Sequence, residues 1–240
     1  MSTQGLLYKD KIDVNQYISI AIPLLGEVID NEEEYYGLVT LLTAMPIDLM
    51  LLLDSAGIDF STINDYELFL RLFPEIQETP KEISRLVFGD LDLTKFKLDI
   101  NPKNGMIILN NPEDGIIIDR AIHGKIAATL RYLHNIEKDR RTPANESAKK
   151  YLLERAKVKS ERNKKKKKDS QLESLIISMV NTEQFKYDFD TVRNLTIYQF
   201  NKSVKQILHK INYEHRMNGI YAGTIDSKKL SQDDLSWLSN

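Results

Sequence analysis

A lysine-rich stretch in the second half of the chain interrupts the hydrophobic pattern around it. Residues 142–169 read TPANESAKKYLLERAKVKSERNKKKKKD, and no apolar side chain occurs between Val158 and Leu172. A segment without apolar residues has no hydrophobic reason to pack, so residues 159–169 are predicted to project as a solvated helix extension or loop. The core must therefore come from the residues on either side of this stretch.

The same stretch begins with the pattern of an amphipathic helix. Thr142 can cap this helix, and Pro143 suits its first position, where a missing N–H costs nothing. Apolar residues then recur at steps of three and four along one face. They are Ala144, Ala148, Tyr151, Leu152 and Ala156. We expect this face to dock on another part of the protein.

Charge is distributed unevenly along the chain. Residues 138–168 carry 14 basic and four acidic side chains, whereas residues 1–100 carry 18 acidic and seven basic ones, although the formal net charge is only −2. The densest basic run is a candidate partner-binding segment. It consists of Lys164, Lys165, Lys166, Lys167 and Lys168. These lysines either bind nucleic acid or an acidic protein face, or they form a solubilising linker. No aromatic residue is interleaved with them, so stacking on exposed bases is not indicated.

The composition limits the classes of protein to consider. A length of 240 residues with 42% hydrophobic residues is enough for one large domain or two small ones. The chain has no cysteine, which excludes disulfides, thiolate metal sites and a cysteine nucleophile. The first residues, MSTQGLLYKDKID, lack the order of a signal peptide, and no apolar run approaches the roughly 20 residues needed to span a bilayer. A cytosolic protein is expected.

The first part of the chain has the pattern of linked helices. A helical stripe over residues 13–29 is interrupted by Pro23, which indicates two short helices or one kinked helix. Asn31 and Glu34 have the spacing of a capping box. The sequence IDLMLLLDSAG, which ends at Gly57, is apolar on nearly all sides and predicts a central helix.

One more helix and a change of period follow. Asn64 and Glu67 form a second capping box, and Pro74 is expected to close the helix that it opens. Residues 95–119 then contain FKLDI, GMIIL and GIIID, separated by turn-forming NPKNG and NNPEDG. This pattern predicts a three-stranded antiparallel meander. Its apolar face should rest on the helix that Asp119 can cap.

Three helices are predicted after the lysine run. Ser170 can open the first, and Thr196 with Gln199 forms a capping box at the start of a long second helix. A last short helix is expected to begin at Ser231. Trp237 is expected to dock this tail onto the body, because a large indole near a terminus is more often an anchor than a ligand platform.

No pattern of catalytic residues is apparent. The four histidines are His123, His134, His209 and His215, and no two of them are spaced as zinc ligands on a helix. His123 lies beside a predicted helix cap, which could be a catalytic position, but no motif ties a serine or aspartate to it. The acids Glu32, Glu33 and Glu34 fit the first turn of a helix better than a cation site. No phosphate-binding glycine motif occurs. We expect no enzymatic activity, no cofactor and no metal.

An acidic and aromatic segment is a second candidate partner-binding site. Its residues are Tyr187, Asp188, Phe189 and Asp190. The alternation of aromatic and acidic side chains is consistent either with a docking patch or with an ordinary surface turn.

Two segments resemble proteins encoded in tail-gene clusters of phages that infect Gram-positive bacteria. One is SQLESLIISMVNTEQFKYDFDTVRNLTIYQFNKSVKQI, and the other is YYGLVTLLTAMPIDLMLLLDSAGIDFSTINDYELFLRLF. LTIYQFNKSVKQI is similar to the L-T-x-x-E-F helix start of tail assembly chaperones, although Gln199 stands where an acidic residue is usual. The resemblance implies a non-enzymatic protein that binds a tape-measure, tube or baseplate protein in the host cytoplasm, or a component of the finished virion.

The expected fold is α+β and predominantly helical. We divide it into an acidic helical subdomain (1–90), a β-meander with its packed helix (91–141), a basic helical arm or linker (142–169) and a C-terminal helical region (170–240). The leading hypothesis is a phage tail assembly chaperone or tail structural protein, and the basic arm of one copy could also bind the acidic part of the next. The alternative is a nucleic-acid-binding regulator that uses the lysines on phosphates. No membrane partner is expected.

Overall fold

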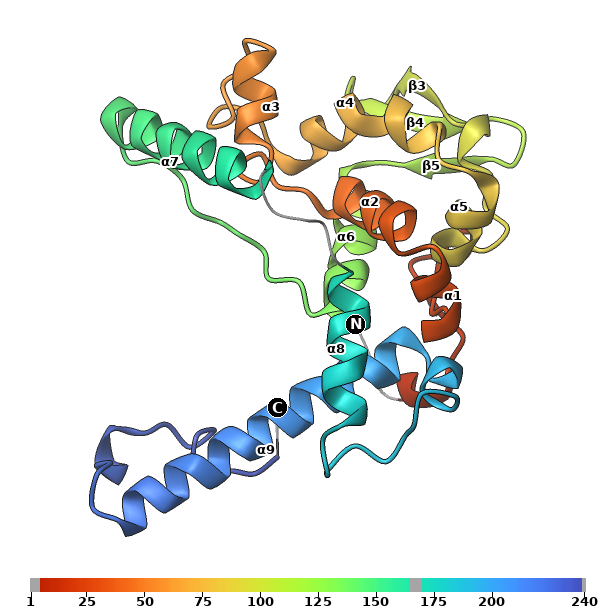
Figure 1. The fold of residues 1–240 in the computed structure, drawn as a ribbon. Coiled ribbons are helices and arrows are strands. Elements are labelled where there is room, and N and C mark those ends of the chain that lie inside the picture. The colour runs from red at the N-terminus through yellow and green to blue at the C-terminus, as the bar shows by residue number, and fades with distance from the viewer. Residues whose placement is uncertain (1–4, 165–169, 239–240) are drawn as a thin grey trace.

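The computed structural model describes residues 5–164 and 170–238 and confirms a mostly helical α+β fold (Figure 1). Within these residues, nine α-helices accompany a three-stranded sheet and a two-stranded hairpin. The helices are α1 (Leu25–Asp30), α2 (Glu32–Thr43), α3 (Met50–Ser55), α4 (Asp65–Gln77), α5 (Lys81–Phe88), α6 (Arg120–His134), α7 (Glu146–Lys164), α8 (Gln171–Val180) and α9 (Ile197–Tyr221). The strands are β1 (Lys11–Asp13), β2 (Ser19–Ala21), β3 (Lys97–Ile100), β4 (Ile107–Asn111) and β5 (Ile116–Ile118).

The N-terminal segment forms a hairpin where the sequence predicts a helix. Strands β1 and β2 pair antiparallel, with Ile12 opposite Ile20. The side-chain amide oxygen of Asn15 accepts hydrogen bonds from the N–H groups of Tyr17 and Ile18 and so closes the turn. The buried apolar residues alternate along both strands, which fits the two-residue period of a strand. Only α1, after Pro23, is helical in the predicted stretch.

The predicted helix caps are confirmed at most positions. Capping boxes form at Asn64 and at Thr196, and the carboxylate of Asp119 accepts a hydrogen bond from the N–H of Ile122. The prediction for Asn31 is wrong, because its side-chain amide instead donates to the carbonyl of Glu27 in the last turn of α1. Pro74 does not close α4. The helix continues for three residues beyond it, and Ile76 in that extension is buried.

The predicted meander is confirmed, with strand order β3-β4-β5 and antiparallel pairing throughout. Leu109 at its centre is fully buried and lies between Leu98 and Ile118 on the same face. Helix α6 packs against β5, as expected. Helix α4 contributes a second support, since the Tyr66 hydroxyl lies 3.1 Å from the carbonyl oxygen of Ile107 and 3.0 Å from that of Ile118.

One hydrophobic core joins the two ends of the chain. It extends from Leu6 to Ile207 and includes both sheets and the first half of α9. The backbone links these parts directly. The N–H of Leu25 donates to the carbonyl oxygen of Leu195 at 2.7 Å, and the N–H of Ile197 donates to the carbonyl oxygen of Pro23 at 2.9 Å. Helix α2 occupies the centre and packs on α4, α5 and α6.

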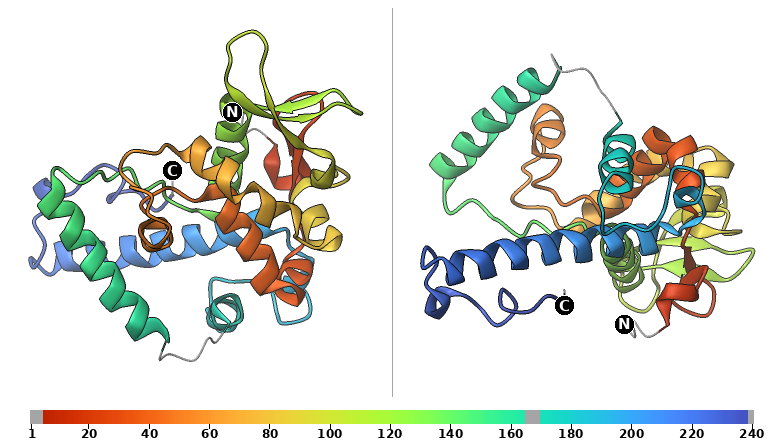
Figure 2. Two further views of the ribbon diagram at one scale, coloured as in Figure 1. Left: turned by 90° about the horizontal axis from the view of Figure 1, so that it is seen from above. Right: turned by 60° about the horizontal axis from the view of Figure 1, so that its bottom comes forward.

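The helix predicted to be central lies at the edge of the molecule. Helix α3 spans only six residues, and Leu52 in it is 54% exposed. It ends near the predicted place, since Ala56 caps it and Gly57, the next residue, adopts a left-handed φ of 69°. Its main partner is α7, and the pair projects from the body (Figures 1 and 2). An apolar run therefore does not by itself place a helix in the core.

The second half of α9 forms another projecting limb (Figure 1). The chain after α9 folds back along it as turns and not as the predicted α-helix, although Ser231 caps a turn by accepting from the N–H of Asp234. The tail is held through backbone carbonyls, because the side chain of Gln206 donates to the carbonyl of Trp237 at 2.7 Å. The prediction that the Trp237 indole anchors the tail is wrong, because Trp237 is 55% exposed.

Candidate interaction surfaces

Helix α7 carries the predicted basic arm and begins later than the sequence indicates. Asn145 caps it by accepting a hydrogen bond from the N–H of Ala148 at 2.8 Å, so Thr142 and Pro143 lie in the preceding loop. Asparagine is a slightly better cap than threonine, which is consistent with this choice. The docking face is confirmed for Leu152 and Ala156, which are half-buried, but Tyr151 is exposed.

Ion pairs attach α7 to the acidic part of the same chain. Lys149 Nζ lies 2.7 Å from Asp59 Oδ2, and Lys157 Nζ lies 3.2 Å from Asp54 Oδ2. The hydrogen bond from Lys149, together with those from Ser61, lowers the pKa of Asp59 to about 2. The inner face of α7 is therefore partly neutralised within the chain.

The solvent-exposed surface of α7, which we call its outer face, carries more basic than acidic side chains. Its exposed basic residues are Lys150, Arg155, Lys159 and Arg162, and the acids Glu154 and Glu161 lie exposed among them. The predicted lysine run follows in the sequence: Lys164 is the last residue of α7, and Lys165, Lys166, Lys167 and Lys168 lie outside the described residues. The arm thus has an inner face committed to its own chain and an outer face directed to solvent.

The acidic and aromatic segment is a surface turn with an internal hydrogen-bond network. The carboxylate of Asp188 accepts hydrogen bonds from the hydroxyl of Thr191 at 2.6 Å and from its N–H at 2.8 Å, and these bonds hold the pKa of Asp188 below its usual value. Tyr187 packs on the buried ring of Phe185, with ring centroids 5.3 Å apart. Asp188 therefore shapes the turn, whereas Phe189 and Asp190 are exposed.

Glu32 has a role that the sequence does not reveal. Its carboxylate accepts hydrogen bonds from the hydroxyl of Ser170 and from the N–H of Leu172, so it caps the first turn of α8. A carboxylate at a helix N-terminus is favourable because it faces unpaired N–H groups. Arg193 makes a second link to the N-terminal part, with its guanidinium 2.6 Å from Asp30. Both contacts join residues far apart in the chain, so no local pattern indicates them.

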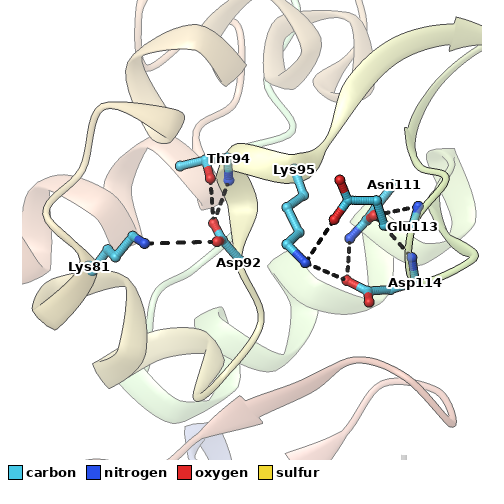
Figure 3. Close-up of polar contacts among 7 residues, drawn as sticks. All are labelled: Lys81, Asp92, Thr94, Lys95, Asn111, Glu113 and Asp114. Carbon is cyan, nitrogen blue, oxygen red and sulfur yellow. Dashed lines mark hydrogen bonds and ion pairs between the residues drawn. The ribbon is translucent and has the colours of Figure 1, made fainter.

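A polar cluster connects α5, the 3₁₀ turn Leu93–Lys95 and the β4–β5 turn (Figure 3). Lys95 Nζ lies 3.0 Å from Glu113 and 3.6 Å from Asp114, and the buried side chain of Asn111 donates to Asp114. On the other side of the turn, Asp92 accepts from the hydroxyl and N–H of Thr94 and faces Lys81 at 4.0 Å. These bonds stabilise the two turns against each other.

A cavity of about 110 Å³ lies beside Asp92 and Thr94. Ser84 and Arg85 of α5 also line it, and the Ser84 hydroxyl has no hydrogen-bond partner. No histidine lines this cavity, so Ser84 has no imidazole base beside it. The space is large enough for a few water molecules, which fits a structural cavity.

Both histidines on α6 lie beside aromatic rings, His123 buried and His134 half-buried. His123 stacks on Phe69 at a centroid distance of 4.2 Å, and desolvation by burial lowers its pKa to about 4. His134 lies 3.0 Å from the hydroxyl of Tyr35, and burial lowers its pKa to about 4 as well. In the described part of the chain, no cluster of three or more histidines and carboxylates could hold a metal ion.

The geometry thus defines a mostly helical α+β protein with two projecting limbs, α3 with α7 and the second half of α9. Residues 164–240 match the family model YomV second domain, which is phage-related. This region contains α8, α9 and the folded-back tail, together with the predicted lysine run and acidic aromatic turn. No curated protein and no solved structure matches the chain. No helix among the described residues has both the length and the apolar character to cross a membrane.

Proposed function

We propose that this protein is a non-enzymatic component of phage tail assembly, either a chaperone or a structural subunit, which acts through protein–protein contacts. The phage-related match over residues 164–240 supports the setting. The expected places of action are the host bacterial cytoplasm and the virion. Tape-measure, tube and baseplate proteins are the proposed partners.

The accessible surface is the observation that carries this proposal. The chain exposes 15300 Å² at a mass of 27.7 kDa. A compact monomer of this mass exposes about 11,000 Å² according to the general scaling of surface with mass. The excess of roughly 4,000 Å² is comparable to the area that permanent complexes bury. Both limbs stand away from the body and contribute to this excess (Figure 2). Such a shape favours a protein that is completed by its neighbours.

The limbs offer chemically different surfaces to partners. The outer face of α7 is basic on balance, although Glu154 and Glu161 interrupt it, and this charge suits an acidic protein face. The limb built on α9 exposes apolar side chains, of which Leu208 is 52% exposed, Tyr221 79% and Trp237 55%. Aromatic side chains of this kind are frequent anchors in protein interfaces.

The second candidate function is nucleic-acid binding by a regulator. The exposed basic residues of α7, continued by Lys164–Lys168 in sequence, favour it because such a row can contact phosphates. The ion pairs of Lys149 and Lys157 weigh against it, since acidic residues beside the row repel a polyanion. This function predicts an affinity for DNA or RNA that falls steeply with salt.

The two functions are distinguished by affinity capture from phage-producing cells, with and without nuclease, followed by mass spectrometry. Tail proteins that persist after nuclease treatment support the assembly function, whereas proteins that are lost with nuclease support the regulator. A variant with Lys150, Arg155, Lys159 and Arg162 changed to glutamine tests the outer face of α7. A control with Arg120 and Lys125 changed to glutamine removes exposed positive charge from α6, outside both limbs, and should leave capture unchanged.

A further inference from the structure

Strand β3 is an apolar, unpaired edge of the three-stranded sheet. All four of its residues are exposed, and no strand of the described chain pairs with its outer side. Leu98 is 60% exposed and Ile100 is 63% exposed, although both lie on the face that is buried at Leu109. Ile107 on β4 continues this apolar face and is 52% exposed. Exposed apolar edges tend to pair with another strand.

The backbone of Leu98 is directed outward. The N–H of Asn101 donates to the carbonyl of Met106, so Asn101 bonds toward β4. Bonding direction alternates along an antiparallel strand, which turns the N–H and C=O of Leu98 toward the open edge. The next outward N–H, that of Ile100, donates to the carboxylate of Asp99 at 2.8 Å. Leu98 is therefore the residue at which this edge can accept a new strand.

The charges on either side of Leu98 are self-complementary. Lys97 and Asp99 flank it, and both are exposed on the opposite face from Leu98. If two copies of β3 pair antiparallel about a twofold axis at Leu98, each Lys97 stands opposite the Asp99 of the other copy. The alternative symmetric register, centred on Asp99, would place two carboxylates opposite each other, which is unfavourable.

We propose that β3 is the interface of a symmetric dimer, in which a second copy of this chain pairs with it antiparallel about Leu98. The pairing makes one continuous six-stranded sheet and brings the exposed leucines of the two copies side by side. Two reciprocal bonds between the Leu98 backbones and two Lys97–Asp99 pairs fix the register. This surface is separate from both limbs, so it leaves them available to the partners proposed above.

The first test is the oligomeric state by sedimentation velocity at low ionic strength. The wild-type protein is expected to dimerise, and Lys97→Asp should weaken the dimer about tenfold because each copy then opposes two carboxylates. The double variant Lys97→Asp with Asp99→Lys should restore dimerisation, since the pair is reversed in both copies. Lys103→Asp, in the β3–β4 turn, makes the same charge change outside the register and should have no effect. Circular dichroism checks that each variant is folded.

The second test uses the absence of cysteine in the natural chain. In the proposed register the two Leu98 Cα atoms are about 5.5 Å apart, within the range that a disulfide bridges. Leu98→Cys should therefore form a disulfide-linked dimer on mild oxidation, whereas Ile100→Cys should not, because those residues are separated along the strands. A monomeric wild-type protein, a dimer insensitive to Lys97→Asp, failure of the double variant to dimerise, or equal cross-linking at both positions would overturn the proposal.

Discussion

Helix α7 and the first half of α9 are both long helical segments, but they are held in different ways. Phe200 and Ile197 of α9 are fully buried, and the backbone at the start of this helix is hydrogen-bonded to Pro23 and Leu25. Helix α7 has half-buried side chains and lies on α3 through ion pairs near the surface. Burial contributes far more free energy than exposed ion pairs. Leu153 is the side chain of α7 that packs against the core. We therefore expect the first half of α9 to belong to the folding unit and α7 to be able to detach without unfolding the body.

The largest expected effect is loss of core packing at α9. Phe200→Ala removes a fully buried ring that contacts Phe185, and the free energy of unfolding should fall by about 3–5 kcal/mol. Leu208→Ala on the exposed side of the same helix should change it by less than about 1 kcal/mol. Chemical denaturation measures both values. Equal effects would mean that α9 is not anchored by its first half.

The body should lose stability in mild acid because of His123 and His134. Burial lowers each pKa from 6.5 to about 4 in the folded protein, so the unfolded state binds more protons. The contribution of the two neutral histidines to the free energy of unfolding is fully present above about pH 6.5 and is lost as the pH falls toward 4. The loss is on the order of 2–3 kcal/mol for each residue. Unfolding curves across this range measure the loss. His134→Gln should flatten the dependence.

A smaller effect is expected where the C-terminal region meets α2. Glu32→Gln weakens the acceptor for Ser170 and Leu172 and should lower the free energy of unfolding by about 1 kcal/mol. Glu34→Gln, an exposed neighbour in the same helical turn, is the matched control. Thermal unfolding is sensitive enough to separate them. No difference between the two variants would show that the α8 cap contributes little.

The smallest effect on global stability is expected at α7. Lys149→Met removes the partner of Asp59, and its consequence should be faster protease cleavage in residues 135–145 at an unchanged unfolding midpoint. The pKa of Asp59 is lowered from the ordinary aspartate value of 3.8 to about 2. Acid should therefore release this contact only when the pH falls below 3.8 toward 2. At pH 5 the body should already be less stable, whereas the contact of α7 should be intact. Limited proteolysis at pH 5 therefore distinguishes the two acid sensitivities. A fall in the midpoint would contradict the comparison.

Local patterns predict much of this fold, and long-range contacts account for what they miss. The capping boxes at Asn64 and Thr196 and the turns of the meander depend on residues within a few positions, so the sequence is sufficient. The hairpin β1–β2 is missed because its apolar residues fit a helical period as well as an alternating one. The role of Glu32 is missed because Ser170 is far away in sequence.

The candidate surfaces are predicted only in part. The apolar face of α7 can be read from the sequence, but its acidic counterpart at Asp54 and Asp59 depends on where α3 lies. The exposed edge at Leu98 is also hidden from sequence, since its apolar pattern is that of any half-buried strand.

Helix α7 lies between two anchored points of the chain, and this raises its local concentration at its binding surface on α3. Before it, Asn135 donates to the carbonyl of Asn201 at 3.3 Å, and after it Ser170 is bonded to Glu32. A segment tethered at both ends meets its own binding surface at an effective concentration in the millimolar range. Weak ion pairs are then sufficient to keep α7 on α3, and exchange of α7 between copies is disfavoured at ordinary protein concentrations. A foreign partner that captures this helix must outcompete that local concentration.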